Sequence, residues 1–174
     1  ERTLETKIAD LLNEMPSGSI QKKDALMEDM IALGEGGIVG FAGFLTPPEE
    51  GGDASVRYAL GSLAKYVSEG KNDSVRQMVS RAMVTSLEQE KNSDVKAFLM
   101  SRLGKAAGDE AIPAMEKHLT DPQLCDPAAM ALAEIGTPLA EKTLSAALST
   151  SNNKVLLAVV YALGDLQTKN DLDV

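Results

Sequence analysis

Residues 92–119, NSDVKAFLMSRLGKAAGDEAIPAMEKHL, decide the fold of this chain. A first helix opens with Asp94-Val95-Lys96 and ends at Leu103-Gly104, because a glycine after the last apolar residue permits the left-handed turn that closes many helices. A turn through Gly108-Asp109 then leads into a second helix from Glu110 to Leu119. The stretch therefore predicts two short helices packed against each other.

The pair Leu-Gly or Ile-Gly returns along the chain, and each copy is predicted to end a short apolar helix. The five copies are Leu33-Gly34, Leu60-Gly61, Leu103-Gly104, Ile135-Gly136 and Leu163-Gly164. Successive glycines are 27, 43, 32 and 28 residues apart. A repeat on this scale is typical of a solenoid, in which each unit buries its apolar face against its neighbours.

These units resemble HEAT repeats, in particular the short HEAT-like units of the phycobilisome lyase family. The resemblance rests on Asp94-Val95-Lys96, the closing Leu103-Gly104, the Gly108-Asp109 turn and Ala111-Ile112-Pro113 in the second helix. Val56-Arg57 echoes the opening of the unit. The resemblance implies an all-α fold, a right-handed α-α superhelix of about five helix pairs.

The rest of the chain divides into an irregular N-terminal cap and loop, residues 1–52, and a repeat array, residues 53–174. Further helices are expected over residues 3–14, 20–33, 38–45, 53–66, 72–90, 127–135, 138–148 and 153–164. A glycine-rich turn is expected at residues 34–37, and a loop rich in proline and glycine at residues 46–53. No second helix is expected after residue 164, so we expect the chain to be a fragment of a longer protein.

Composition narrows the class of protein and of partner. The chain is 44% hydrophobic but has only three Phe, three Tyr and no Trp, so Ala, Leu, Val and Met must fill its core. Its net charge of −9 argues against a nucleic-acid partner, since binding phosphate backbones requires clustered Lys and Arg. No apolar run is long enough for a membrane span. The single cysteine, Cys125, allows no disulfide within the chain, which fits a reducing compartment without excluding the periplasm. An exported or periplasmic location is slightly favoured over the cytoplasm.

Motifs that carry chemistry are sparse. A lone histidine, His118, precedes Cys125 without any known catalytic arrangement, and the ligands of a zinc site are missing. Glu49, Glu50 and Asp53 lack the spacing of a calcium loop. The glycines of residues 34–40 fail as a dinucleotide fingerprint, because the preceding segment is helical where a strand is required. We therefore expect no catalytic residue, cofactor or metal.

The favoured function is that of a non-catalytic scaffold that binds another protein or an adjacent domain, for instance as an accessory module of a larger exported bacterial protein. Loops of solenoids commonly carry such contacts, and loop 46–53 is the candidate contact segment. Its candidate contact residues are Glu49, Glu50, Asp53 and Arg57.

Three further expectations accompany this function. Arginines 57, 76, 81 and 102 could line one face and meet an acidic partner. The last helix is expected to expose an apolar face and to support weak self-association; that face comprises Val155, Leu156, Val159 and Leu163. The alternative function is a bilin lyase-like or other ligand-binding HEAT-like enzyme.

Overall fold

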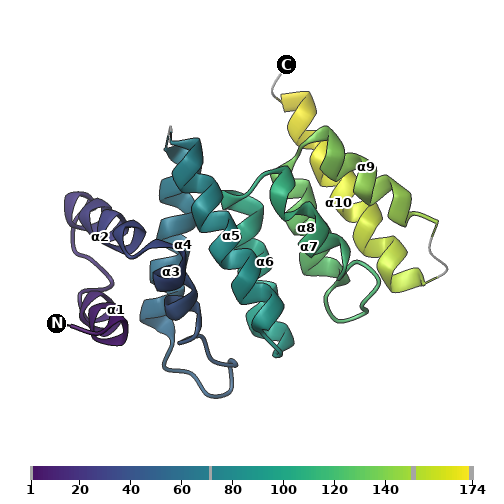
Figure 1. Cartoon of the computed structure of the whole chain (residues 1–174). Helices are drawn as coiled ribbons and strands as arrows, with labels where there is room; N and C mark the ends of the chain where they lie inside the picture. Colours follow the sequence, from purple (N-terminus) through teal and green to yellow (C-terminus); the bar gives the residue numbers. More distant parts are fainter. Residues whose placement is uncertain (1, 71, 150–151, 173–174) are drawn as a thin grey trace.

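The computed structural model describes residues 2–70, 72–149 and 152–172, and over these residues it is all-helical (Figure 1). The first five helices are α1 (Leu4–Asn13), α2 (Ile20–Ala32), α3 (Gly34–Ala42), α4 (Ala54–Glu69) and α5 (Asp73–Gln89). The remaining elements are α6 (Ser93–Ala106), the 3₁₀ turn η1 (Asp109–Ala111), α7 (Ile112–Glu116), α8 (Cys125–Ile135), α9 (Pro138–Ala147) and α10 (Asn153–Leu172).

The helices form two rows that advance from one end of the molecule to the other. In the first row α4, α6, α8 and α10 pack side by side in that order, and in the second row α3 packs on α5, α5 on η1 and α7, and α7 on α9. Figure 1 shows the N-terminal α1 and α2 at one end and α10 at the other. Each helix thus makes its main contacts with helices close to it in sequence.

Polar side chains at the helix starts fix where these elements begin. Thr3, Ser19, Asn72, Asn92 and Thr137 each accept a hydrogen bond from a backbone N–H in the first turn of their helix. Such a cap contributes about 1 kcal/mol by satisfying an N–H that has no partner within the helix. The helix expected to open at Asp94 is capped by Asn92 instead and begins one residue earlier, at Ser93.

The Leu-Gly pairs do not all end helices. Gly136 ends α8 with a left-handed φ of 68° and an N–H bond to Leu132 O, as expected. By contrast, Gly61, Gly104 and Gly164 lie inside helices. The reason is clearest at Gly104, where an added Cβ would lie only 3.1 Å from the Cα of Ala131 in α8. This glycine serves the close approach of two helices.

Several helix boundaries also differ from the expectation. The glycine turn at residues 34–37 reduces to Gly34 alone, with φ 68°, and α3 begins at once because the following glycines adopt helical geometry. The second helix of the 92–119 unit is shortened to η1 and α7, which end at Glu116. At the other end of the chain, α10 continues past Gly164 to Leu172.

The core consists mainly of Ala, Leu, Met and Val side chains, as the composition predicts. Phe41 is the one fully buried aromatic side chain among those described, and the other five rings are half-buried or exposed. No helix in the described part of the chain combines the length and the apolarity that crossing a bilayer requires.

The prediction that the last helix exposes the face with Val155, Leu156, Val159 and Leu163 is wrong. Val155 and Val159 are 1% and 0% exposed, and Leu156 and Leu163 are half-buried. The residues that α10 exposes instead are Leu157, Val160 and Tyr161. Because α10 carries apolar side chains on all of its sides, the sequence does not distinguish its buried face from its exposed one.

Candidate functional site

Loop 46–53 joins α3 to α4, and its two ends are tied together by hydrogen bonds. The Thr46 backbone N–H donates to Asp53 Oδ2 over 3.0 Å, and the Thr46 hydroxyl donates to the carbonyl oxygen of Gly51 over 2.8 Å. Arg57 reaches back from the first turn of α4. Its Nε donates to Asp53 Oδ2 over 2.8 Å and its Nη2 to the Thr46 carbonyl oxygen over 3.0 Å.

Asp53 closes this loop instead of capping α4. Its side chain makes no cap hydrogen bond, because Oδ2 is engaged by Thr46 and Arg57. Burial alone would raise the pKa of Asp53. The hydrogen bonds from Arg57 and Thr46 outweigh burial, and the pKa lies below its ordinary value. The carboxylate is therefore ionised at neutral pH and holds Arg57 in place.

The predicted contact residues thus divide into two groups. Asp53 and Arg57 form the base of the loop, whereas Glu49 and Glu50 are exposed on it. The Glu50 N–H donates to the Pro47 carbonyl oxygen over 3.0 Å, which shapes the tip as a turn. A loop held this way can present two carboxylates to a partner with little loss of conformational entropy on binding.

Beside the loop base, two arginines stack on one phenylalanine ring. The guanidinium carbon of Arg57 lies 4.8 Å from the ring centre of Phe98 in α6, and that of Arg102 lies 5.1 Å from it. Both distances fall within the range of cation–π attraction. A Cβ on Gly61 would lie 3.0 Å from Arg102 Nη1, so the glycine of α4 makes room for this side chain.

Arg102 differs from the other four arginines in having no carboxylate partner among the described residues. Arg2, Arg57, Arg76 and Arg81 each form an ion pair. Arg102 Nη2 donates to the Ser101 hydroxyl over 2.9 Å, and its buried Nε has no partner. Burial lowers the pKa of Arg102 because the charged group is partly withdrawn from water. Of the four arginines considered as partner contacts, Arg102 is therefore the one whose guanidinium could still donate hydrogen bonds to a carboxylate of a partner.

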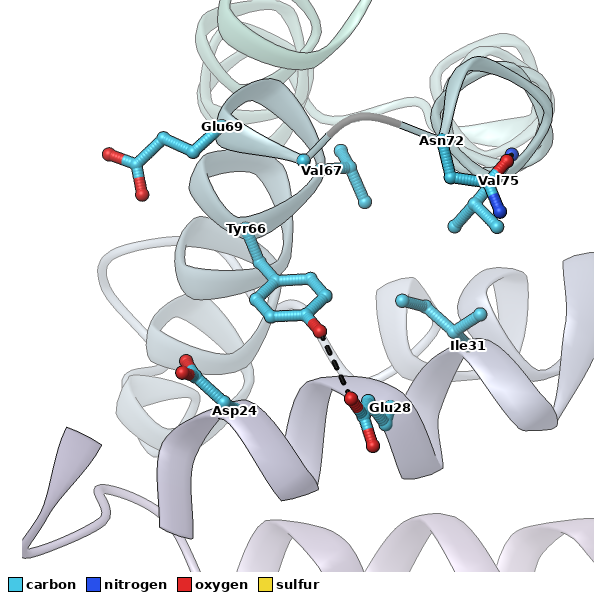
Figure 2. A pocket seen from close by; sticks show the side chains of 9 residues that line it. Asp24, Glu28, Ile31, Tyr66, Val67, Glu69, Asn72 and Val75 are labelled. Carbon is cyan, nitrogen blue, oxygen red and sulfur yellow. Dashed lines mark hydrogen bonds between the residues drawn. The ribbon is translucent and has the colours of Figure 1, made fainter. Parts of the chain in front are cut away.

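A second surface feature is an open pocket of about 500 Å³ between α2 and the junction of α4 with α5 (Figure 2). Ile31, Val67 and Val75 provide its apolar part. In Figure 2 Tyr66 points from α4 towards α2, where its hydroxyl donates to Glu28 Oε1 over 3.3 Å.

The same pocket carries acidic side chains. Asp24 and Glu28 lie beside the phenol on α2. Burial, and then the negative charges of Glu28 and Asp24, raise the pKa of Tyr66.

His118 and Cys125, the residues considered for catalysis, form no side-chain hydrogen bond with each other in the described part of the chain. His118 lies just past α7, with a pKa lowered by burial and by Lys96, and Cys125 is buried with a pKa raised by burial. The Cys125 thiol donates weakly to the Pro122 carbonyl oxygen at 3.9 Å. Across residues 2–70, 72–149 and 152–172, no three His, Cys, Asp or Glu side chains gather as a metal site.

Comparisons with known proteins give no family for this chain. No family model matches it, and no curated protein does so either. Two crystal structures of engineered proteins from the Northeast Structural Genomics Consortium are similar to it. The first shares 18% identity and a TM-score of 0.38, over 95% of this chain and 81% of that one. The second shares 16% identity and a TM-score of 0.30, over 92% of this chain and 96% of that one.

Proposed function

We propose that this chain is a HEAT-like α-solenoid that acts as a non-catalytic scaffold for another protein or an adjacent domain. The observation that carries the proposal is the loop tied by Asp53 and Arg57, next to Arg102, which has no carboxylate partner among the described residues. Repeat scaffolds commonly bind through extended surfaces and the loops that project from them.

The binding surface in this proposal combines both charge signs. Glu49 and Glu50 are exposed on the loop and would meet basic groups of the partner. Arg102, whose guanidinium lies over the Phe98 ring, would bind a carboxylate of the partner and so form an ion pair that no described residue supplies. Because the loop and the ring are joined through Arg57, the partner would contact them as one surface.

The test is a pull-down from an extract of the source cells, with this chain as bait and mass spectrometry of the retained proteins. The wild-type bait should retain a stoichiometric protein. The double variant Glu49→Lys/Glu50→Lys and the single variant Arg102→Glu should each lose it. The matched control Glu141→Lys reverses an exposed carboxylate on α9 and should retain the partner. Equal retention by all four baits would place the contact elsewhere, and an empty wild-type bait would oppose the scaffold function.

A ligand-binding function, such as that of a bilin lyase-like enzyme, is the second candidate, and the pocket beside Tyr66 is the observation that favours it. Its test is incubation with phycocyanobilin followed by a visible absorption scan. A shifted band that is lost in Ile31→Arg, a half-buried residue of the pocket wall, would support ligand binding, provided that circular dichroism shows the variant folded. An unchanged spectrum would leave the scaffold function as the better proposal.

A further inference from the structure

The outer face of α10 carries a continuous apolar stripe. Leu157, Val160 and Tyr161 are 56%, 51% and 69% exposed, and Gly164 continues the same line. Their spacing of three, four and seven residues places them on one face of the helix. We call this set of four residues the α10 stripe. Large exposed apolar side chains in a contiguous set commonly mark an interface.

The corresponding face of α6 shows what such a stripe packs against. Asn92 precedes α6 and Asn152 precedes α10, and each side-chain oxygen accepts first-turn N–H groups of its helix. Gly104 follows Asn92 by 12 residues in the sequence, and Gly164 follows Asn152 by the same number. Gly104 packs against α8, with an added Cβ 3.1 Å from Ala131 Cα. The face of α10 that bears Gly164 is therefore the one that packs against the next helix of the row.

No described residue covers that face in this structure. A Cβ added to Gly164 would meet nothing within 4 Å. Figure 1 likewise shows α10 as the last helix of the first row, with α9 beside it and no element beyond. The α10 stripe is thus a helix-packing surface without its helix.

We propose that the stripe binds the α10 stripe of a second copy of this chain, antiparallel, about a two-fold axis between Val160 and Tyr161. In this arrangement Leu157 of each copy lies opposite Gly164 of the other, so that the largest aliphatic side chain meets the smallest residue. Val160 of each copy meets Tyr161 of the other. Only an antiparallel pair sets Leu157 of one copy against Gly164 of the other, and this pairing of the same surface on both copies is a two-fold, isologous contact.

Charges at the edge of the stripe favour the same arrangement. Lys154 is exposed near the start of α10 and has no ion pair in the part of the chain that the structure describes. Asp165 follows Gly164 directly at the other end of the stripe and lies on the same flank, with its Oδ2 3.0 Å from Lys169 Nζ. An antiparallel pair sets this flank against its own copy. Lys154 of each chain then lies beside Asp165 of the other, which adds two attractive contacts at the rim.

The dimer should be weak and reversible. A stripe two helical turns long falls well short of the roughly 800 Å² per partner of standard interfaces. The net charge of −9 on each copy adds repulsion. We therefore expect dissociation constants of roughly 10 µM to 1 mM, the range of transient complexes.

Sedimentation velocity across this concentration range tests the proposal. The weight-average mass of the wild type should rise towards twice that of the chain. Val160→Glu and Leu157→Glu should remain monomeric, while Leu139→Glu, at a 45% exposed site on α9, should dimerise like the wild type. Far-UV circular dichroism checks that all variants are folded, which exposed substitutions normally permit. A wild type that stays monomeric at about 1 mM, or that grows beyond a dimer, overturns the proposal.

Disulfide cross-linking tests the direction of the two helices. In a Cys125→Ala background, which removes the only thiol, Leu157→Cys mixed with Gly164→Cys should cross-link roughly tenfold faster than either variant alone, because the interface raises the local thiol concentration. Leu139→Cys should cross-link only at the slow background rate. Fast cross-linking of Leu157→Cys with itself would show a parallel pair and would contradict the two-fold axis proposed here.

Discussion

Arg57 donates a hydrogen bond to Asp53 over 2.8 Å, and this pair joins the first turn of α4 to the loop that precedes it. The same guanidinium group stacks on the Phe98 ring at 4.8 Å. One side chain therefore fixes the loop and links it to the neighbouring helix α6. This arrangement makes the loop part of the rigid structure, and it leads to the first two predictions.

Replacing Asp53 by Asn should destabilise the fold by about 1–3 kcal/mol, the range for losing charge-assisted hydrogen bonds at a buried site. The Asp53 side chain is only 10% exposed, and the substitution leaves Arg57 without its counter-ion. Urea unfolding at neutral pH measures the loss. Glu50→Gln, an exposed change in the same loop, is the control and should be neutral within about 0.5 kcal/mol.

The stabilisation from Asp53 should depend on pH with a definite sign. Its pKa in the folded chain lies below the ordinary value of about 3.9 for an unfolded Asp, so the unfolded chain binds the proton more readily. The stabilisation is complete above about pH 5 and is lost as the pH falls through the folded pKa. The stability difference between wild type and Asp53→Asn should therefore be constant from about pH 5 to 8 and shrink below about pH 4. A difference that grows on acidification contradicts the assignment.

Two glycines inside helices should respond oppositely to alanine. Gly104→Ala places a Cβ against the backbone of Ala131 and should cost about 1–2 kcal/mol of unfolding free energy, because the backbone of α8 cannot yield easily. Gly164→Ala meets nothing within 4 Å and should stabilise by about 0.5–1 kcal/mol through helix propensity. Thermal unfolding of both variants at low concentration measures the pair. A Gly104→Ala variant at least as stable as the wild type would refute close packing at Gly104, and a destabilised Gly164→Ala variant would contradict open space at Gly164.

Removing the charge of Arg102 should not weaken the fold. Arg102→Met keeps much of the side chain's packing on Phe98 and removes a half-buried charge that lacks a carboxylate, so the unfolding free energy should stay level or rise by up to about 1 kcal/mol. Arg76→Met is the comparison. Arg76 bonds both Asp73 and Glu110, and its loss should cost about 1–2 kcal/mol. A large loss in Arg102→Met would mean that the residue stabilises the fold and is not available to a partner.

Local signals in the sequence predicted local features of the fold well. Gly136 as a left-handed helix end depends on a few neighbouring residues, and it is observed. Gly61 and Gly104 carry the same Leu-Gly signal but lie within helices, because their role depends on Arg102 and Ala131, which are distant in sequence. Local spacing cannot reveal such a neighbour.

The candidate site shows the same division. The exposure of Glu49 and Glu50 agrees with the proline- and glycine-rich composition of their loop. By contrast, the hydrogen bond from Thr46 to Asp53 and the placement of Arg57 and Arg102 over the Phe98 ring require three separate segments to meet. These segments are loop 46–53, α4 and α6. For α10 the sequence pattern could not show which face is buried, because every residue from 155 to 161 is apolar.

The arrangement in two advancing rows has a kinetic consequence. Since most contacts join helices close in sequence, the chain can fold without first closing long loops, and topologies of this kind fold rapidly. Folding can start within any adjacent set of helices and grow outward along the rows. Helices α1 and α10 lie at the two ends of the molecule, so amide hydrogens there should exchange with solvent sooner than those of α6, which is enclosed by α4, α5 and α8.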